Sequence, residues 1–175
     1  MGNCRAQVPD FVEPDCSFES GRVVALAFIH SDIHAAVYND PSNPNVWVDG
    51  NYSADLHIFQ NVRGTYDGGS PIDAPGIGNQ DTRVINKDHS MNVRIQGVKS
   101  NEDFFNEIVK SSEYRVAFVV GGDYNLLMLN NVNTSIVGGS PVEEGLDSNV
   151  EWSVDIKWKD INNPKTSDVP NGIFN

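Results

Sequence analysis

Residues Gly64–Thr82 read GTYDGGSPIDAPGIGNQDT and separate two runs of strand-like sequence. The segment contains five glycines and two prolines, a composition that disfavours both a helix and a central strand. A structureless loop of this length inside a compact domain is uncommon and is usually functional or disordered. Because the segment carries no combined set of nucleophile, base and metal ligands, we expect it to reach a partner surface rather than to catalyse a reaction.

Strands are predicted on both sides of this loop. Leu56–Val62 precedes it and alternates loosely between apolar and polar residues. After it, Arg83–Asn86 and Met91–Gly97 predict a hairpin around the polar residues 87–90. In the second of these strands every other residue is apolar, which is typical of a half-buried strand.

The upstream sequence predicts a buried strand followed by a short helix. Arg22–His30 is a continuous β-branched and aromatic run, which favours a strand buried on both faces. Ser31–Tyr38 predicts one or two helical turns, with Ser31 or Asp32 as the cap. Val46–Val48 follows a turn and predicts a short strand.

The downstream sequence predicts one longer helix and several strands. The helix is Ser100–Ser111, with Ser100 at the N-cap and an apolar stripe that would face a sheet. The strands are Tyr114–Val120, Tyr124–Asn130, Thr134–Val137 and Val150–Trp158, of which the last alternates without a break.

These elements predict a mainly β fold with antiparallel pairing. About seven or eight strands and one flanking helix indicate a β-sandwich or partial barrel. We expect an N-terminal arm over residues 1–21, a β domain over 22–160 and a C-terminal arm over 161–175, because both ends are polar and contain prolines. The apolar residues Phe11, Phe18 and Phe174 are the arm positions expected to contact a neighbouring subunit.

The charge balance excludes several classes of function. The chain has 175 residues with a formal net charge of −12, so its surface repels phosphate and anionic membranes. A sequence-reading nucleic-acid binder is disfavoured, whereas an acidic channel would let DNA slide without adhesion. No apolar run approaches the roughly 20 residues that span a bilayer. The two cysteines, Cys4 and Cys16, are expected to be free thiols in a reducing cytosol, although one disulfide is the alternative.

Possible chemical sites are weighed against ordinary structural roles. His30 and His34 have helical metal-ligand spacing but no evident third ligand, so structural histidines are favoured. Calcium binding by Asp67, Asp73 and Asp81 is likewise less favoured than solvated loop carboxylates. The sequence therefore predicts no catalytic residues, no metal and no cofactor. The three tryptophans, which would be needed for sugar stacking, are expected to pack in the core or an interface.

One family resemblance is carried by the segment around the long loop. The residues are VRGTYDGGSP at Val62–Pro71, APGIG at Ala74–Gly78 and DTR at Asp81–Arg83, followed by FNEI at Phe105–Ile108 and YRV at Tyr114–Val116. This pattern resembles virion proteins of the crAss-like bacteriophages, and the similarity covers roughly Arg22–Trp158.

The resemblance implies a tail or neck component with a tail-tube-like fold. Such a protein would form a homo-oligomeric ring of six or twelve copies, stack on neighbouring ring proteins and let DNA pass. It would be made in the host cytoplasm and reside in the virion. The loop residues expected at the subunit interface are Tyr66, Asp67, Pro71, Ile72, Pro75 and Ile77. The alternatives are a carbohydrate-binding or adhesion module, or a head decoration or spike protein.

Overall fold

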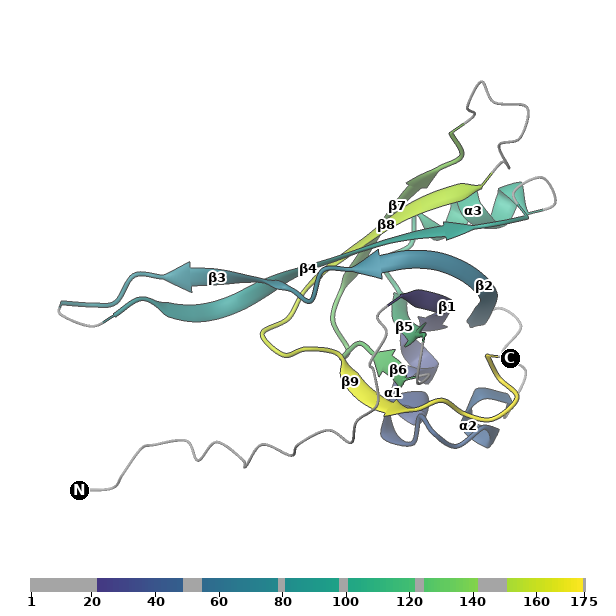
Figure 1. Ribbon diagram of the computed structural model, residues 1–175, viewed down its shortest axis with the longest axis horizontal. Coiled ribbons are helices and arrows are strands. Elements are labelled where there is room, and N and C mark those ends of the chain that lie inside the picture. The colour runs from purple at the N-terminus through teal and green to yellow at the C-terminus, as the bar shows by residue number, and fades with distance from the viewer. Residues whose placement is uncertain are drawn as a thin grey trace.

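A single antiparallel sheet organises the molecule, as seen in a computed structural model that describes residues 22–48, 55–78, 81–97, 101–121, 125–141 and 151–174. Within these ranges nine strands form the sheet in the order β7-β8-β4-β2-β1-β5-β6-β9, with β3 paired to β4 (Figure 1). The prediction of a mainly antiparallel β fold with a flanking helix is confirmed. The sheet is one open sheet rather than the two packed sheets of a sandwich.

The strands vary from four to thirteen residues. They are β1 Val23–His30, β2 Leu56–Tyr66, β3 Ser70–Ala74, β4 Arg83–Ile95, β5 Tyr114–Val120, β6 Asn125–Met128, β7 Thr134–Gly139, β8 Trp152–Lys159 and β9 Lys165–Asp168. The helices are α1 Ser31–Asn39, α2 Asn45–Val48 and α3 Glu102–Ile108. Within the described residues, no helix is both long and apolar enough to cross a membrane.

Strand β1 is the centre of the core, as its continuous apolar sequence predicts. It pairs with β2 on one side and β5 on the other, and its residues are almost all buried. One face of the sheet packs around Phe28 and Phe118 and is covered by α3, where Phe105 stacks on Trp152 at 4.4 Å. The opposite face of β1, β5 and β6 is covered by α1, α2 and the C-terminal residues. The two apolar clusters explain why β1 has no polar face.

The helices differ from expectation in two places. Val46–Val48 is part of α2 and is not a strand, because the side chain of Asn43 accepts a hydrogen bond from Asn45 N–H at 3.0 Å and starts a helical turn. The cap of α1 is His30 rather than Ser31 or Asp32, since its ring nitrogen accepts from the Asp32 backbone. The helix predicted over Ser100–Ser111 is present as α3, but it is shorter, spanning Glu102–Ile108, and its N-cap position is Asn101. The expected cap, Ser100, lies outside the described residues.

Strand β4 corrects the prediction of a hairpin around residues 87–90. Arg83–Ile95 is one uninterrupted strand, whose polar middle pairs with β8 from Asp88 onward. The prediction of one structureless loop over Gly64–Thr82 is also wrong in part. Strand β2 continues to Tyr66, and Ser70–Ala74 forms β3, which pairs with β4. Pro71 is tolerated there because β3 pairs with β4 alone within the described part of the chain, so its other edge needs no backbone donor there.

The C-terminal segment is part of the body rather than an arm. Strand β9 pairs antiparallel with β6 and extends the sheet at that end. Beyond it, Phe174 packs edge-on against Trp47 with ring centroids 5.2 Å apart. The ammonium of Lys165 donates to the Tyr38 carbonyl at 2.9 Å and lies 4.8 Å above the Tyr38 ring. Residues 161–174 therefore complete one face of the core.

Candidate functional site: a projecting ribbon and the groove at its base

The most distinctive feature of the molecule is a two-stranded ribbon formed by β3 and the first half of β4. Residues Ser70–Ala74 pair with Arg83–Asp88, and Figure 1 shows this ribbon projecting away from the sheet and helices. None of its residues belongs to either apolar core cluster among the described residues. An isolated two-stranded ribbon is at best marginally stable in water, so this one depends on its base or on a partner.

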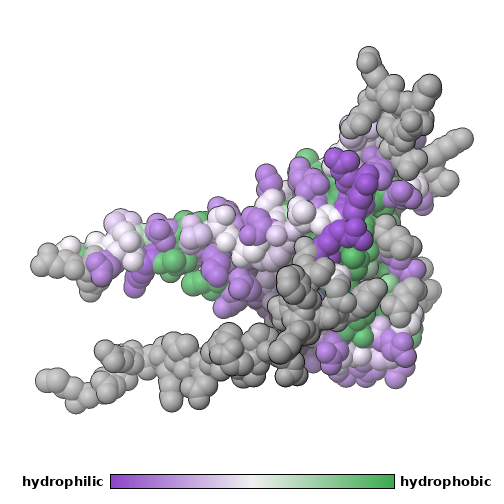
Figure 2. All heavy atoms as spheres, viewed as in Figure 1, coloured by the Kyte–Doolittle hydropathy of each residue, from purple (hydrophilic) through white to green (hydrophobic). Residues whose placement is uncertain are grey.

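Apolar side chains are exposed along this ribbon, and Figure 2 shows hydrophobic residues on its surface. Ile77 at its tip is 88% exposed, while Val84 and Ile85 on β4 are 44% and 50% exposed. Pro71 and Pro75 are exposed as well, and Ile72 is half-buried. Runs of large apolar groups in water are unfavourable, and they mark surfaces that bind something.

The ribbon is anchored by a stack of three rings. His89 and Trp158 are parallel with centroids 5.1 Å apart, and Tyr66 stacks on Trp158 at 5.6 Å. His89 is buried; its Nε2–H donates to the Asp160 carbonyl at 2.8 Å, so Nδ1 is left to accept from the Tyr66 hydroxyl, also at 2.8 Å. Burial, with a further contribution from the Asp67 carboxylate, raises the pKa of Tyr66 to about 12, so the hydroxyl keeps its proton at neutral pH.

Asp67 closes the turn that connects the sheet to the ribbon. Its Oδ1 accepts from the Gly69 N–H at 2.9 Å and from the Ser90 N–H at 3.1 Å. Gly68 and Gly69 follow with φ of 78° and 86°, a left-handed conformation that only glycine adopts at little cost. A side chain at Gly69 would meet the His89 ring at 2.5 Å. The turn therefore requires both the carboxylate and the glycines.

An open groove of about 900 Å³ lies at the base of the ribbon. Its apolar part comes from Val109, Ile136, Val137 and Trp158, and its basic residues are Lys110, Lys157 and Lys159. Lys110 is paired with Glu107 at 2.7 Å and Lys159 with Asp88 at 3.5 Å. Within the described ranges, Lys157 forms no salt bridge. Strand β7 borders this groove and, among the strands that the structure describes, pairs with β8 alone.

The nine residues predicted at a subunit interface fall into separate groups. Pro71, Ile72, Pro75 and Ile77 lie together on the ribbon, where they are at least partly accessible. Tyr66 and Asp67 hold the base of the ribbon, which is a structural role. Phe174 is only 8% exposed and packs inside its own chain. Phe11 and Phe18 lie outside the described residues.

Sequence reasoning missed Val84, Ile85 and the groove. The two apolar residues of β4 were assigned to an ordinary hairpin strand, and their consecutive placement beside Arg83 carries no sign that they are exposed. The groove is formed by five segments between Asp67 and Lys159, so no local sequence pattern predicts it.

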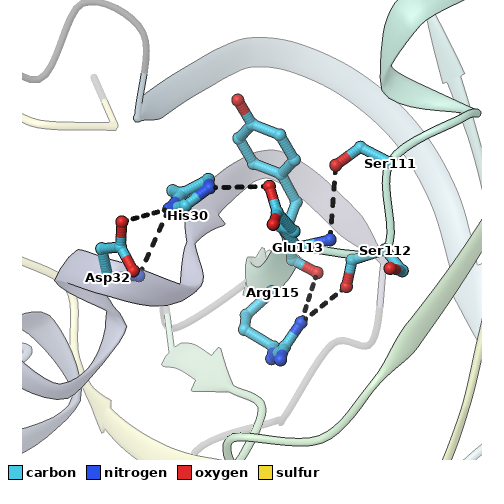
Figure 3. Close-up of polar contacts among 7 residues, drawn as sticks. His30, Asp32, Ser111, Ser112, Glu113 and Arg115 are labelled. Atoms are coloured by element: carbon cyan, nitrogen blue, oxygen red, sulfur yellow. Dashed lines mark hydrogen bonds and ion pairs between the residues drawn. The ribbon is translucent and has the colours of Figure 1, made fainter.

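A second polar cluster lies at the junction of β1, α1 and β5, and Figure 3 shows His30 between two carboxylates. His30 Nε2 donates to Glu113 at 3.2 Å, while Nδ1 accepts from the Asp32 backbone at 3.3 Å. Arg115 donates to the Ser112 carbonyl at 3.0 Å, and burial lowers the pKa of its guanidinium from the usual value. These contacts cap α1 and fix the loop before β5, so the cluster has a structural explanation.

The metal hypotheses find no support in the geometry. The described residues contain no group of three His, Cys, Asp or Glu side chains that would hold a metal ion. His34, one of the spaced histidines, is buried and donates from Nε2 to the Leu129 carbonyl at 2.8 Å. Burial lowers its pKa, so the ring is neutral at physiological pH.

Comparison of the chain with family models, with curated proteins and with solved structures found no match.

Proposed function

We propose that this chain is a structural subunit of a bacteriophage tail or neck, where copies assemble into a ring that serves as a conduit for the genome. The observation that carries the proposal is the β3–β4 ribbon, whose exposed apolar side chains are covered by no described part of the chain. A ribbon of this kind gains stability when another subunit covers it.

The ring follows from the kind of contact that a ribbon makes. A projecting element and the surface that receives it are different patches, so the contact between copies is heterologous. Heterologous contacts close into rings when the rotation between subunits permits it, and otherwise extend into filaments. The assignment to a phage virion rests on the sequence resemblance across the ribbon, together with the antiparallel β fold expected of tail-tube-like proteins.

The acidic charge agrees with a conduit through which DNA passes. A net charge of −12 per copy, multiplied around a ring, creates a negative field that opposes adhesion of a polyanion. We expect no retention of double-stranded DNA by the assembled protein in an electrophoretic mobility assay at 0.1 M salt. Tight, salt-sensitive DNA binding would contradict the conduit.

The tryptophans that a sugar-binding site would need are buried in this fold. Trp47, Trp152 and Trp158 are 2%, 2% and 4% exposed, and so form no platform on which a sugar ring would stack. A head decoration or spike protein would share the ribbon, so the geometry of the assembly must distinguish it from a tail or neck ring.

The decisive experiment shortens the ribbon and examines assembly. In the shortened variant, Pro75–Thr82 is replaced by Asn-Gly, which closes β3 onto β4 with a two-residue turn. We expect wild-type protein at high concentration to form closed rings in negative-stain electron microscopy, and the shortened variant to remain monomeric with an unchanged melting temperature. Val48→Asp is the matched control, because Val48 is 64% exposed but lies on α2. Rings that form equally well without the ribbon tip would refute the proposal.

A further inference from the structure

We propose that the ribbon tip of one copy lies in the groove at the base of the ribbon on a second copy, so that contacts run head to tail. The proposal rests on the assembly proposed above and names the surface that receives the ribbon. The donor surface is defined by Ile77, Val84, Ile85 and Asp73. The acceptor surface is defined by Val137 and Lys157 on the outer face of β7 and β8, while Ile136 and Trp158 line the groove from the buried face of these strands.

The two surfaces have matching chemistry. The ribbon presents exposed aliphatic groups with Asp73 and Asp81 beside them. The groove presents apolar side chains beside three lysines and two carboxylates, Asp67 and Asp88. Lys110 and Lys159 are paired with Glu107 and Asp88, so Lys157 is the groove lysine that forms no salt bridge among the described residues. Val137 on the groove is itself 62% exposed, so both surfaces leave aliphatic groups in water when the copies are apart.

The size of the groove suits several side chains. A volume of about 900 Å³ falls at the upper end of the range of roughly 300–1,000 Å³ typical of ligand pockets. The groove is also open, which a protruding ribbon requires. Lys157, which forms no salt bridge within the described ranges, lies between Ser90 and Ser135 on neighbouring strands and is placed to meet an incoming carboxylate.

A ribbon tip that fills the groove must come from another copy. Asp67, Ser70 and Asp88 line the groove and are also the residues at which the ribbon begins. The tip lies beyond Ala74, and each strand residue adds about 3.3 Å in the direction away from the base. Figure 1 shows the ribbon running outward without bending back. A ribbon therefore cannot fill the groove at its own base.

The test mixes two variants that are each defective in one surface. The donor variant carries Ile77→Asp and Val84→Asp, and the acceptor variant carries Val137→Gln and Lys157→Glu. Each alone should lose assembly by about tenfold or more in dissociation constant, the loss expected when a contact central to an interface is removed. An equimolar mixture retains one intact donor and one intact acceptor, so it should form one-to-one dimers that do not extend, as measured by native mass spectrometry.

The outcomes separate this inference from the proposed function. Dimers in the mixture support head-to-tail seating of the ribbon. Loss of assembly in the donor variant but not in the acceptor variant would overturn the inference and leave a ribbon-dependent assembly in place. Normal assembly of the donor variant would overturn both. Val48→Asp again serves as the control for added surface charge.

Disulfide trapping provides a second measurement that does not depend on weakened binding. In a background of Cys4→Ser and Cys16→Ser, one protein carries Ile77→Cys and the other carries Val137→Cys. Mild oxidation should give a covalent dimer of the two different chains. The pairing of Ile77→Cys with Val48→Cys is the negative control. Equal yields in both mixtures would contradict the proposed seating of the ribbon.

Discussion

At the scale of single residues, two adjacent glycines test how the ribbon is anchored. Gly68 and Gly69 both have left-handed φ, so alanine at either position should cost about 1–2 kcal/mol in backbone strain. Only Gly69 faces a neighbour, the His89 ring. We therefore expect Gly69→Ala to cost a further 1–3 kcal/mol or so in the free energy of unfolding, because the ring or the turn must move.

Urea unfolding of the two variants measures this difference, and Gly68→Ala serves as the control for strain alone. If the structure accommodated the new methyl group at residue 69 without cost, the urea midpoints of Gly68→Ala and Gly69→Ala would be equal. That result would mean that the contact between the turn and His89 does not fix the ribbon.

A buried histidine gives the fold a pH dependence at the same scale. Burial lowers the pKa of His34 below its usual value of 6.5, and the nearby Arg115 charge acts in the same direction. The unfolded chain then binds a proton that the folded chain does not, so stability is fully present above pH 6.5 and falls as the pH decreases below it. The slope from one such group is at most about 1.4 kcal/mol per pH unit.

The variant His34→Gln isolates this contribution because its amide N–H still reaches the Leu129 carbonyl but does not titrate. Chemical unfolding at a series of pH values from about 7.5 to about 5, the range in which histidine titrates, should give a shallower decline in stability for the variant than for the wild type. Parallel curves would show that His34 is protonated in the folded state as readily as in the unfolded chain.

At the scale of elements, the C-terminal segment shows how a polar sequence becomes part of a core. Phe174→Ala should destabilise the monomer by about 3 kcal/mol, because it removes the aromatic cover from buried Trp47. Ile161→Ala in the same segment should change stability by less than about 0.5 kcal/mol, since Ile161 is 49% exposed. Urea midpoints followed by tryptophan fluorescence compare the two. Equal midpoints for Phe174→Ala and wild type would instead indicate a segment free to contact a neighbour.

The elements predicted from sequence were those whose burial follows a local pattern. Strand β8 alternates because one face meets the core, and Trp152, Val154, Ile156 and Trp158 are all buried as that alternation requires. Strand β1 is apolar throughout because both faces are covered. The helix α3 carries its apolar stripe toward Trp152. In each case the sequence itself records which side chains leave water.

The strands that the sequence did not predict form because they pair with strands distant in the sequence. Strand β9 is polar because it lies at an edge of the sheet, and β3 holds a proline for the same reason. The β-branched residues of α2 suggested a strand, although Asn43-Pro44 before them is a recognisable helix start. The ribbon residues Pro71, Pro75 and Ile77 were identified as accessible candidates, but their contact with a partner stays a prediction.

At the scale of the whole molecule, two opposing electrostatic effects decide how copies meet. Each copy carries a net charge of −12, so approaching copies repel over the Debye length, which is about 30 Å at 0.01 M salt and about 10 Å at 0.1 M. An attraction between Lys157 and an incoming carboxylate such as Asp73 would act only near contact, and a pair of exposed charges contributes about 0–1 kcal/mol. The long-range repulsion should therefore govern the association rate, because encounter occurs before the local pair forms.

We accordingly expect the association rate, measured by stopped-flow light scattering, to increase severalfold as salt rises from about 0.01 M to about 0.15 M, since screening removes the repulsion between like-charged bodies. The dissociation rate should change little, because the apolar contacts of Ile77, Val84 and Val137 are insensitive to ionic strength. Lys157→Glu should raise the dissociation rate and leave the direction of the salt effect on association unchanged. A steady fall in association rate with added salt would instead mean that complementary charge steers the copies together, and that the acidic residues lie away from the approaching surfaces.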